Sequence, residues 1–508
     1  MGGASTQAAS SARITQEYMD ISRLSSRVAI SGAIRYTERR YTQEVTRVHF
    51  KKYIGSRAFY RRLSVILVPI LIQNLITNFV SLLDNIMVGQ VGTEPMSGVA
   101  IVNQLLFIFN LCIFGGLAGA GILTAQFYGS GDSRGVADTF RAKLYIALAT
   151  VLGFWAMFTF GGDVLIRQFI HEGTEQLDME ATFLHAKDYL HIMLYQLPPF
   201  ALQMAYASTL RETGETVLPM KAGVTAVLVN LALNYILIFG KLGAPALGVE
   251  GAAVATVIAH YIECAVIVIW THRHREQNRF LNTAFSTFRI PGALARQIAV
   301  IGLPLLVNEL LWSSGMTFLG QCYSMRGLEA VSADNIRRTV SNLFFCAFLS
   351  MGSAISIIVG QRLGAGDLEG AVEEDRKLLV FSVVLCAAVG VVMALFAPLM
   401  PRIYNTSDNV RRLASQLILV TALFMPAYGF TNACYFTLRA GGKSFITFLF
   451  DSCYQWVLVV PLAFVLSRYT AMPLVPMAFT IECMELIKCV LGYILVKRRG
   501  WVKDLVNG

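Results

Sequence analysis

The stretch of sequence that decides the fold occurs twice. The first copy, Val68–Gly135, begins VPILIQNLITNFVSLLDNIMVGQVG and ends ILTAQFYGSGDSRG; the second, Leu303–Gly370, begins LPLLVNELLWSSGMTFLGQCYSMRG and ends SIIVGQRLGAGDLEG. A single shift of 235 positions (304 − 69 = 235) aligns the two copies without a gap. It pairs Pro69 with Pro304, Gly92 with Gly327, Ser97 with Ser332, Gln126 with Gln361, Gly129 with Gly364, Asp132 with Asp367 and Gly135 with Gly370. A repeat of this length predicts two structurally equivalent halves.

The composition predicts that both halves lie in a membrane. Of the 508 residues, 55% are hydrophobic and 15% are charged, and the mean hydropathy is +0.57. Soluble chains typically carry about 25% charged residues. A membrane-spanning helix needs about 20 mostly apolar residues, and continuous rather than alternating apolar runs favour helices over a barrel. We therefore predict an all-α integral membrane protein.

Twelve transmembrane helices are predicted, six in each half. Their expected ranges are 63–88, 97–127, 144–161, 188–209, 218–239, 251–271, 298–324, 332–361, 378–398, 414–437, 446–467 and 474–496. The similarity extends further, because TLRETG at Thr209–Gly214 matches TLRAGG at Thr437–Gly442 at a shift of 228 (437 − 209 = 228). Since six is even, both halves have the same orientation. A pseudo-two-fold axis along the membrane normal is then expected to relate the two six-helix bundles.

The domain organisation follows from these helices. We predict an N-terminal cytoplasmic extension at 1–60, a first bundle at 61–271, a cytoplasmic linker at 272–297, and a second bundle with its tail at 298–508. An excess of Lys and Arg in the loops of one side places both termini in the cytoplasm. We expect the plasma (cell inner) membrane. The paired Gly-x-Gly-Asp turns are predicted elbows, in which glycine ends one helix and Asp132 or Asp367 caps the next.

Several classes of protein are disfavoured. The net charge of +10 comes from basic residues in short breaks between apolar runs, so nucleic acid is not an expected partner. The nine cysteines and seven histidines show no metal or disulfide spacing. The glycines from Gly115 to Gly121 resemble a dinucleotide loop, but no strand precedes them, and Gly115 and Gly119 instead let two helices approach closely. Without a cluster of acid, base or metal-binding residues, we expect neither an enzyme nor a cofactor.

Asp84 is the leading candidate for a functional site. Burying a charge in lipid costs at least about 2.5–3.5 kcal/mol, so an acidic residue inside a span suggests a function. Asp84 lies 15 residues after Pro69, roughly 22 Å along a helix, and therefore in the outer half of the membrane. The second copy has Leu319 at the shifted position. Asp84 can bind a proton or Na⁺, the one metal ion that we consider; the alternative is a carboxylate solvated at the outer interface.

Polar residues of the fifth and sixth spans are candidate partners of Asp84. Asn230 and Asn234 are four residues apart in VNLALNYILIFG and therefore share one helix face. Their amides can complete a cation site or hydrogen-bond a protonated carboxyl group, and Thr256 in GVEGAAVAT adds a hydroxyl group. The alternative is that these residues only hydrogen-bond neighbouring helices together.

In the second half, Glu309 and Arg338 are candidates for a further cation or substrate site. Glu309 is the ionisable residue nearest Pro304. Asp334 precedes Arg338 by four residues, so a local helix ion pair is the leading interpretation of Arg338. Glu485 and Lys488 are expected to pair in the same way, three residues apart.

Taken in order, these motifs resemble the multidrug and toxic-compound extrusion (MATE) transporters. The resemblance covers about Phe59 to Arg499 and rests on MVGQVG, AQFYGSGD, LRETG, NLALNYILIFG, GVEGAAVAT, GLPLLVNELLWSSGM and VGQRLGAGD. It implies a secondary antiporter that exports amphipathic, often cationic, organic compounds in exchange for H⁺ or Na⁺ through a central cavity that alternates between faces. The expected partners are such small molecules and membrane lipids, and the chain is expected to act as a monomer.

The resemblance also implies roles for individual residues. In one branch of the family the first-span aspartate is a coupling-ion site, which matches Asp84. The fifth-span pattern there is Asn-x-x-x-Asp, whereas this chain has Asn230 and Asn234, so a proton is at least as plausible as Na⁺. Another branch uses a seventh-span glutamate, and Glu309 lies near that place. The alternative function is a flippase for lipid-linked saccharides, which would need more intramembrane arginines than Arg337 and Arg338.

Overall fold

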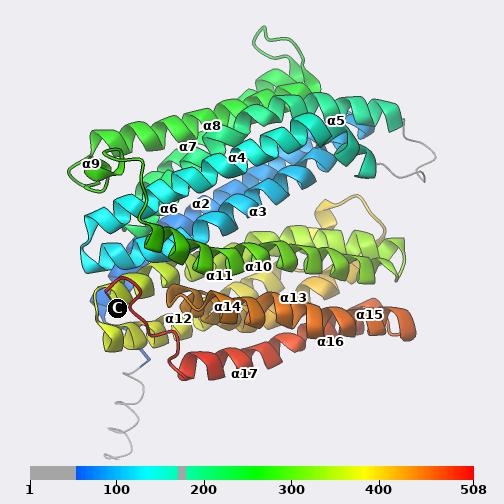
Figure 1. Ribbon diagram of the computed structural model, residues 1–508. Coiled ribbons are helices and arrows are strands. Elements are labelled where there is room, and N and C mark those ends of the chain that lie inside the picture. Colours follow the sequence, from blue (N-terminus) through cyan, green and yellow to red (C-terminus); the bar gives the residue numbers. More distant parts are fainter. Residues whose placement is uncertain (1–52, 170–178, 508) are drawn as a thin grey trace, which may run out of the picture. The chain divides into compact units, whose positions relative to one another are not determined.

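The structure is a computed structural model that describes residues 53–169 and 179–507 (Figure 1). Every regular element within these ranges is a helix. Residues from Ala58 onward form one compact unit, and the description below concerns this unit. Almost all of the predicted extension at 1–60 lies outside the described residues.

The first half contains the helices that the repeat predicts. They are α2 (Arg57–Gly89), α3 (Thr93–Ser130), α4 (Ser133–Phe169), α5 (Met179–Met193), the short η1 (Leu194–Gln196), α6 (Leu197–Glu212), α7 (Val217–Phe239) and α8 (Gly248–Arg273). The fourth predicted span, 188–209, is not a single helix. Pro198 and Pro199 follow the break at η1, and proline cannot continue the hydrogen-bond ladder of a preceding helix.

The second half repeats this order after the four-residue α9 (Leu281–Ala284). Its elements are α10 (Gly292–Ser324), α11 (Leu328–Gly364), α12 (Leu368–Phe396), η2 (Met400–Ile403), α13 (Asp408–Ala440), α14 (Ser444–Phe448), η3 (Leu449–Cys453), η4 (Gln455–Val459), α15 (Val460–Tyr469), α16 (Leu474–Glu482) and α17 (Met484–Lys497). The run from α14 to α15 is one membrane-length segment, 444–469, that includes the π-helical turns η3 and η4.

Ten helical segments of the described chain are long and apolar enough to cross a membrane. The fourth and twelfth predicted spans are each divided into two shorter helices, α5 with α6 and α16 with α17. The predicted architecture of twelve spans in an all-α membrane protein is therefore confirmed, with two of the spans broken.

The two Gly-x-Gly-Asp turns form equivalent elbows. Gly131 after α3 and Gly366 after α11 have φ values of 78° and 75°, in the left-handed region that favours glycine. In each turn the following aspartate accepts a backbone hydrogen bond: Asp132 Oδ1 from the N–H of Arg134 at 2.9 Å and Asp367 Oδ1 from the N–H of Gly370 at 3.0 Å. The predicted capped elbows are therefore present in both halves.

The halves meet along α3 and α10. A Cβ atom on Gly119 would lie 2.5 Å from the Cα atom of Gly302, and one on Gly115 would lie 2.9 Å from that of Leu306. The predicted close approach at Gly115 and Gly119 is thus between α3 and α10. We call the end of the bundle that carries Gln126 and Gln361 the inner end, because the charge distribution predicts it to be cytoplasmic.

Candidate functional site

Asp84 lies on α2 among polar side chains of α7 and α8. The amide Nδ2 of Asn234 donates a hydrogen bond to Asp84 Oδ1 at 2.8 Å and another to Asn230 Oδ1 at 3.1 Å. The amide of Asn230 donates to Thr256 Oγ1 at 3.2 Å. Asn230 and Asn234 are buried, with 7% and 1% of their surface exposed. The structure therefore brings all four of the predicted first-half residues together.

The local sequence explains this arrangement. Asn230 and Asn234 lie one helical turn apart on α7 and face the same neighbours, and α8 packs beside α7 through Leu237 and Gly251, where a Cβ would lie 2.7 Å from the Leu237 carbonyl oxygen. Thr256 satisfies its own hydroxyl by donating to the Ala252 carbonyl at 2.9 Å. The four side chains therefore converge because of helix spacing and one close helix contact.

The site is rich in oxygen atoms, and the Asn230 amide can face Asp84 with either its oxygen or its nitrogen. If the Asn230 amide is turned over, its nitrogen donates to both carboxylate oxygens of Asp84, at 3.0 and 3.2 Å, while its oxygen accepts from Thr256. The Oδ1 atom of Asn234 is buried and has no hydrogen-bond partner among the described residues. Amide groups that can present either N–H or oxygen suit a carboxylate that gains and loses a proton, and oxygen-only sets suit a hard cation.

Tyr189 of α5 is a neighbour that the sequence did not reveal. Its side chain is buried, with 4% of its surface exposed, and it lies within electrostatic range of Asp84. Tyr189 lies in the amphipathic stretch just before the break at η1, where a tyrosine reads as an ordinary core residue. Only the position of α5 beside the Asp84 site shows that Tyr189 is more than a core residue.

Glu309 lies in a separate polar cluster of the second half. The Tyr435 hydroxyl donates to Glu309 Oε1 at 3.2 Å, and Arg439 Nη1 lies 3.9 Å from the same oxygen. The Arg439 guanidinium also packs over the rings of Phe114 and Phe436, at 5.4 and 5.3 Å from their centroids. Arg439 partly offsets the charge of Glu309, so this site differs from that of Asp84, to which no basic side chain of the described chain is hydrogen-bonded.

A partly buried ion pair adjoins this cluster and corrects one expectation. Lys488 Nζ pairs with Asp451 Oδ1 at 2.7 Å, and Asn308 donates to Asp451 Oδ2 at 3.0 Å. Glu485 instead accepts a hydrogen bond from Thr431. The expected pairing of Glu485 with Lys488 is therefore wrong, because Lys488 forms its ion pair with Asp451 on the π-helical turn η3.

Arg338 does not join Glu309. Its Nε donates to Asp334 Oδ2 at 2.6 Å, and its Nη2 donates to the Met316 carbonyl at 3.4 Å. Arg337 donates to the other oxygen of the same aspartate, also at 2.6 Å. The local ion pair expected of Arg338 is confirmed, while the expected combination of Glu309 with Arg338 is not formed because Asp334 holds the guanidinium one turn away on its own helix.

Comparison with known proteins identifies the family. The MatE family model matches residues 69–236 and 304–465, which correspond to the two halves. The chain belongs to the MatE family. It is therefore an integral membrane transporter and not an enzyme. Among the residues that the structure describes, no group of three or more His, Cys, Asp or Glu side chains is placed to hold a metal ion.

The similarity to curated and solved MatE proteins spans most of the chain. It is 24% identical over 83% of its length to the probable multidrug resistance protein NorM of Thermotoga maritima, covering 89% of that protein. It is 25% identical to the probable multidrug resistance protein YoeA of Bacillus subtilis, over 84% of this chain and 92% of that protein. An outward-facing multidrug resistance MATE family transporter of the MOP superfamily matches the fold with a TM-score of 0.79 and 19% identity, over 88% of this chain and 97% of that one.

The sequence of this MatE protein did not predict one further feature, a buried ion pair. Lys143 of α4 is fully buried and donates to Glu212 of α6, to Ser208 Oγ at 3.1 Å and to Thr209 Oγ1 at 3.0 Å. A lysine beside the elbow reads as a positive residue at the membrane surface. Its burial depends on Glu212, which lies 69 residues later, so no local pattern reveals the pair.

We expect Glu212→Gln to destabilise the protein by about 3–5 kcal/mol, because it leaves the Lys143 ammonium buried without its counter-charge. Thermal unfolding of purified protein in detergent measures the effect. The double variant Lys143→Met with Glu212→Gln should recover most of the loss. Asp408→Asn, which removes an exposed pair with Arg411, is the matched control and should change stability by less than about 1 kcal/mol. Equal effects of Glu212→Gln and Asp408→Asn would contradict the assignment.

Proposed function

We propose that this MatE protein is a secondary active antiporter that exports amphipathic or cationic organic compounds in exchange for H⁺ or Na⁺ by alternating access. The observation that carries the proposal is the Asp84 site, a carboxylate on a membrane-length helix that accepts a hydrogen bond from Asn234, whose amide also binds Asn230. Relatives named as multidrug resistance proteins support drugs as the exported class. Such a transporter needs no cofactor beyond its coupling ion.

The packing supports alternating access. The apolar cluster around Phe109 and Leu197 consists of first-half residues, and the cluster around Met393 and Leu417 consists of second-half residues. A third cluster joins the halves, through Leu123 of α3 and Leu305 of α10 among others. Two bundles that keep cores of their own and meet along a shared seam can rock against each other.

Helix α2 offers a path between ion binding and the seam. Its inner part packs into the core of the second half, where Leu63 and Ile66 join residues of α11 and α13. Its outer part carries Asp84 among first-half residues. Protonation or Na⁺ binding at Asp84 would therefore act on a helix that both halves hold. Coupling requires the ion and the exported compound to prefer different arrangements.

The site leaves both coupling ions open. A protonated Asp84 would donate to an amide oxygen, and Asn234 Oδ1 is a buried acceptor without a partner among the described residues. Na⁺ would instead use oxygens of Asp84 and Thr256 together with the Asn230 oxygen, which faces the Asp84 carboxylate before the amide is turned over. We propose action as a monomer in the plasma membrane with both termini in the cytoplasm. The saccharide-flippase alternative is not favoured, because Arg337 and Arg338 are both ion-paired with Asp334.

Dye efflux from reconstituted vesicles tests the proposal. Wild-type protein is loaded with a fluorescent organic cation on the inside, and a Na⁺ gradient and a pH gradient are imposed separately at matched membrane potential. We expect one gradient to drive efflux well above the rate of protein-free vesicles and the other to have little effect. Equal, gradient-independent leakage in both conditions would contradict an antiporter.

A further inference from the structure

At the inner end, α3 and α11 cross where the two copies of the repeat contact each other. A Cβ atom on Gly129 would overlap the Gln361 backbone, and one on Gly364 would overlap the Gln126 backbone. These four residues are two pairs at the shift of 235. Each copy therefore contributes a glycine to accept the glutamine of the other, and we call this crossing the inner seal.

The glutamine amides extend the inner seal in the same symmetric way. Gln126 Nε2 donates to the Ala440 carbonyl at 3.0 Å, and Gln361 Nε2 donates to the Glu212 carbonyl at 2.8 Å. Glu212 and Ala440 are themselves equivalent, since they occupy the same place in TLRETG and TLRAGG. Each half thus holds the end of α6 or α13 in the other half.

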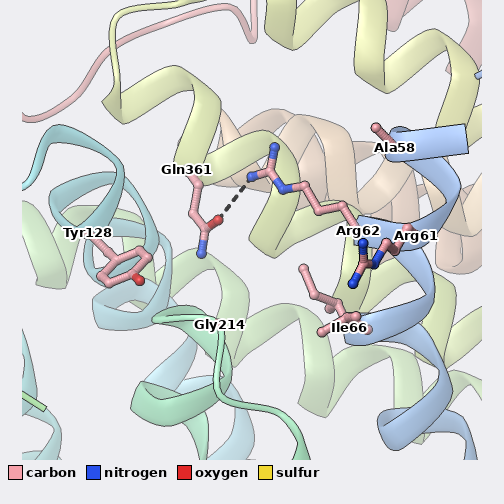
Figure 2. A pocket seen from close by; sticks show the side chains of 8 residues that line it. Ala58, Arg61, Arg62, Ile66, Tyr128, Gly214 and Gln361 are labelled. Carbon is pink, nitrogen blue, oxygen red and sulfur yellow. Dashed lines mark hydrogen bonds between the residues drawn. The ribbon is translucent and has the colours of Figure 1, made fainter. Parts of the chain in front are cut away.

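The two halves differ in the group that binds the side-chain oxygen of each glutamine. The Gln361 oxygen Oε1 accepts a hydrogen bond from Arg62 Nη2 at 3.2 Å, as Figure 2 shows. At the shift of 235 the equivalent of Arg62 is Gln297, within RQIAVIGLP against RRLSVILVP. Gln297 donates instead to the Leu505 carbonyl at 3.0 Å, and the Leu505 N–H donates to Gln126 Oε1 at 2.8 Å. The backbone N–H and carbonyl groups of one residue, Leu505, therefore bridge the gap that an arginine side chain spans in the other half.

The segment after α17 (red, ending at C in Figure 1) is built to reach this place. Trp501 is buried, with 1% of its surface exposed, and donates to the Val496 carbonyl at 3.0 Å. Its backbone runs so close to Gly441 that any side chain there would overlap the Trp501 carbonyl. The segment is therefore anchored in the second half before it turns to the seam.

The last described residues then contact the inner seal. Asp504 Oδ1 accepts the N–H groups of Val506 and Asn507, both at 3.0 Å, and Asn507 Nδ2 donates to the Gly364 carbonyl at 3.2 Å. Partial burial would raise the pKa of Asp504, but hydrogen bonds from Asn507 and these backbone groups hold its pKa below the usual value. The turn is therefore well formed at neutral pH with Asp504 ionised.

The same region is hollow in the other half. A cavity of about 400 Å³ lies beside Arg62 and Gln361, and Ile66 and Gly214 also line it (Figure 2). The equivalent of Gly214 is Gly442, where a Cβ would lie 2.6 Å from the Leu505 side chain. Leu505 and Val506 also pack against the cluster that contains Ile301, the equivalent of Ile66. Residues 503–507 thus occupy the counterpart of an open cavity.

We propose that residues 503–507 are a latch that substitutes for the arginine missing at position 297 and stabilises the state in which the inner end is closed. The bridge Gln126–Leu505–Gln297 holds α3 of the first half to α10 of the second half. The latch must release when the inner end opens, so it sets the balance between the two states. Gln126, Gln297 and Leu505 are positioning residues for transport, and this inference rests on alternating access as the proposed function.

Removing the latch and restoring the arginine tests the proposal. In one variant the chain ends at Val502, which keeps Trp501 in the core; in a second, Gln297→Arg is added to this shortened chain. Hydrogen exchange measured by mass spectrometry over 120–130 and 357–364 reports on the inner seal. We expect exchange in the shortened chain to rise about tenfold, the effect of losing one or two buried hydrogen bonds, and Gln297→Arg to reverse most of the rise.

Two point variants provide a matched comparison in the full chain. Leu505→Pro removes the N–H that binds Gln126, whereas Leu505→Ala keeps both backbone groups of the bridge. The proline variant should exchange like the shortened chain, and the alanine variant should stay closer to wild type. In the shortened chain, Gln297→Met should not rescue the inner seal.

The results that overturn the latch are distinct from those that overturn the antiporter. Wild-type exchange in the shortened chain, a rise spread evenly over all helices, or no reversal by Gln297→Arg would overturn it. Dye efflux driven by the effective ion gradient is measured on the same variants. A change confined to the inner seal without any efflux in wild type would retain the latch and reject the proposed function.

Discussion

Replacing Asp84 by Asn is expected to abolish efflux driven by the coupling-ion gradient and to leave the protein folded. The substitution keeps the shape of the side chain and its ability to hydrogen-bond Asn234, which donates to Asp84 at 2.8 Å in the wild type. It removes the only acidic group of that hydrogen-bonded set. Without a charge to neutralise, an entering H⁺ or Na⁺ no longer distinguishes the two arrangements, and a ligand without differential affinity shifts no equilibrium.

The measurement is the initial rate of dye efflux from vesicles under the gradient that drives the wild type. The Asp84→Asn rate should fall to that of protein-free vesicles, while the melting temperature stays near that of the wild type. Asp163→Asn is the matched control, because Asp163 is an exposed aspartate whose partner Lys187 is also partly exposed; its rate should stay within about twofold of wild type. Coupled efflux by the Asp84→Asn protein would sink the assignment.

Partial replacement of the partners should separate the two coupling ions. Thr256→Val removes one oxygen that a Na⁺ cage would use but leaves the Asp84 carboxylate and both asparagines in place. A proton-coupled transporter should keep most of its efflux, whereas a Na⁺-coupled one should need a higher Na⁺ concentration for the same rate. The Na⁺ and pH dependence of efflux, measured on the same vesicles, gives the answer.

The fold and the first-half site could be predicted because both depend on patterns along the chain. Apolar runs of membrane length define helices, and a gap-free repeat defines their duplication. The convergence of Asn230, Asn234 and Thr256 on Asp84 follows from the spacing of one turn on α7 and from α8 packing beside it. Lipid offers no hydrogen bonds, so polar side chains within apolar helices hydrogen-bond to one another.

Other features depend on contacts that no pattern encodes. The Lys143–Glu212 and Asp451–Lys488 pairs join residues on different helices. Lys143 resembles an ordinary residue at a helix end, and the spacing of Lys488 favoured Glu485 as its partner. Glu309 and Arg338 were candidates for one second-half site, but Arg338 forms the local ion pair with Asp334 that its spacing predicted. The bridge at Leu505 uses backbone groups, which every residue carries, so the sequence of the segment gives no sign of it.

Replacing Gly364 by Ala is expected to open the inner seal, with an effect larger than the loss of the latch. A Cβ atom there would overlap the backbone carbonyl of Gln126, and backbone cannot rotate away as a side chain can. The crossing of α3 and α11 must therefore separate, which also stretches the hydrogen bonds from Gln126 to Ala440 and from Gln361 to Glu212. Close-packed helices resist even one added methyl group, at a cost of about 1–3 kcal/mol.

Because the crossing is symmetric, Gly129→Ala should have the same effect through the opposite contact, its Cβ atom overlapping the Gln361 carbonyl. Hydrogen exchange over 120–130 and 357–364 should rise in both variants, and gradient-driven efflux should fall because the closed state of the inner end becomes costly. Gly153→Ala on α4 is the control, since no neighbouring atom lies within 4 Å of its Cβ position; in a helix it should be neutral or slightly stabilising. An inner seal that tolerates both alanines would show that the two copies of the repeat do not close on each other as the glycines indicate.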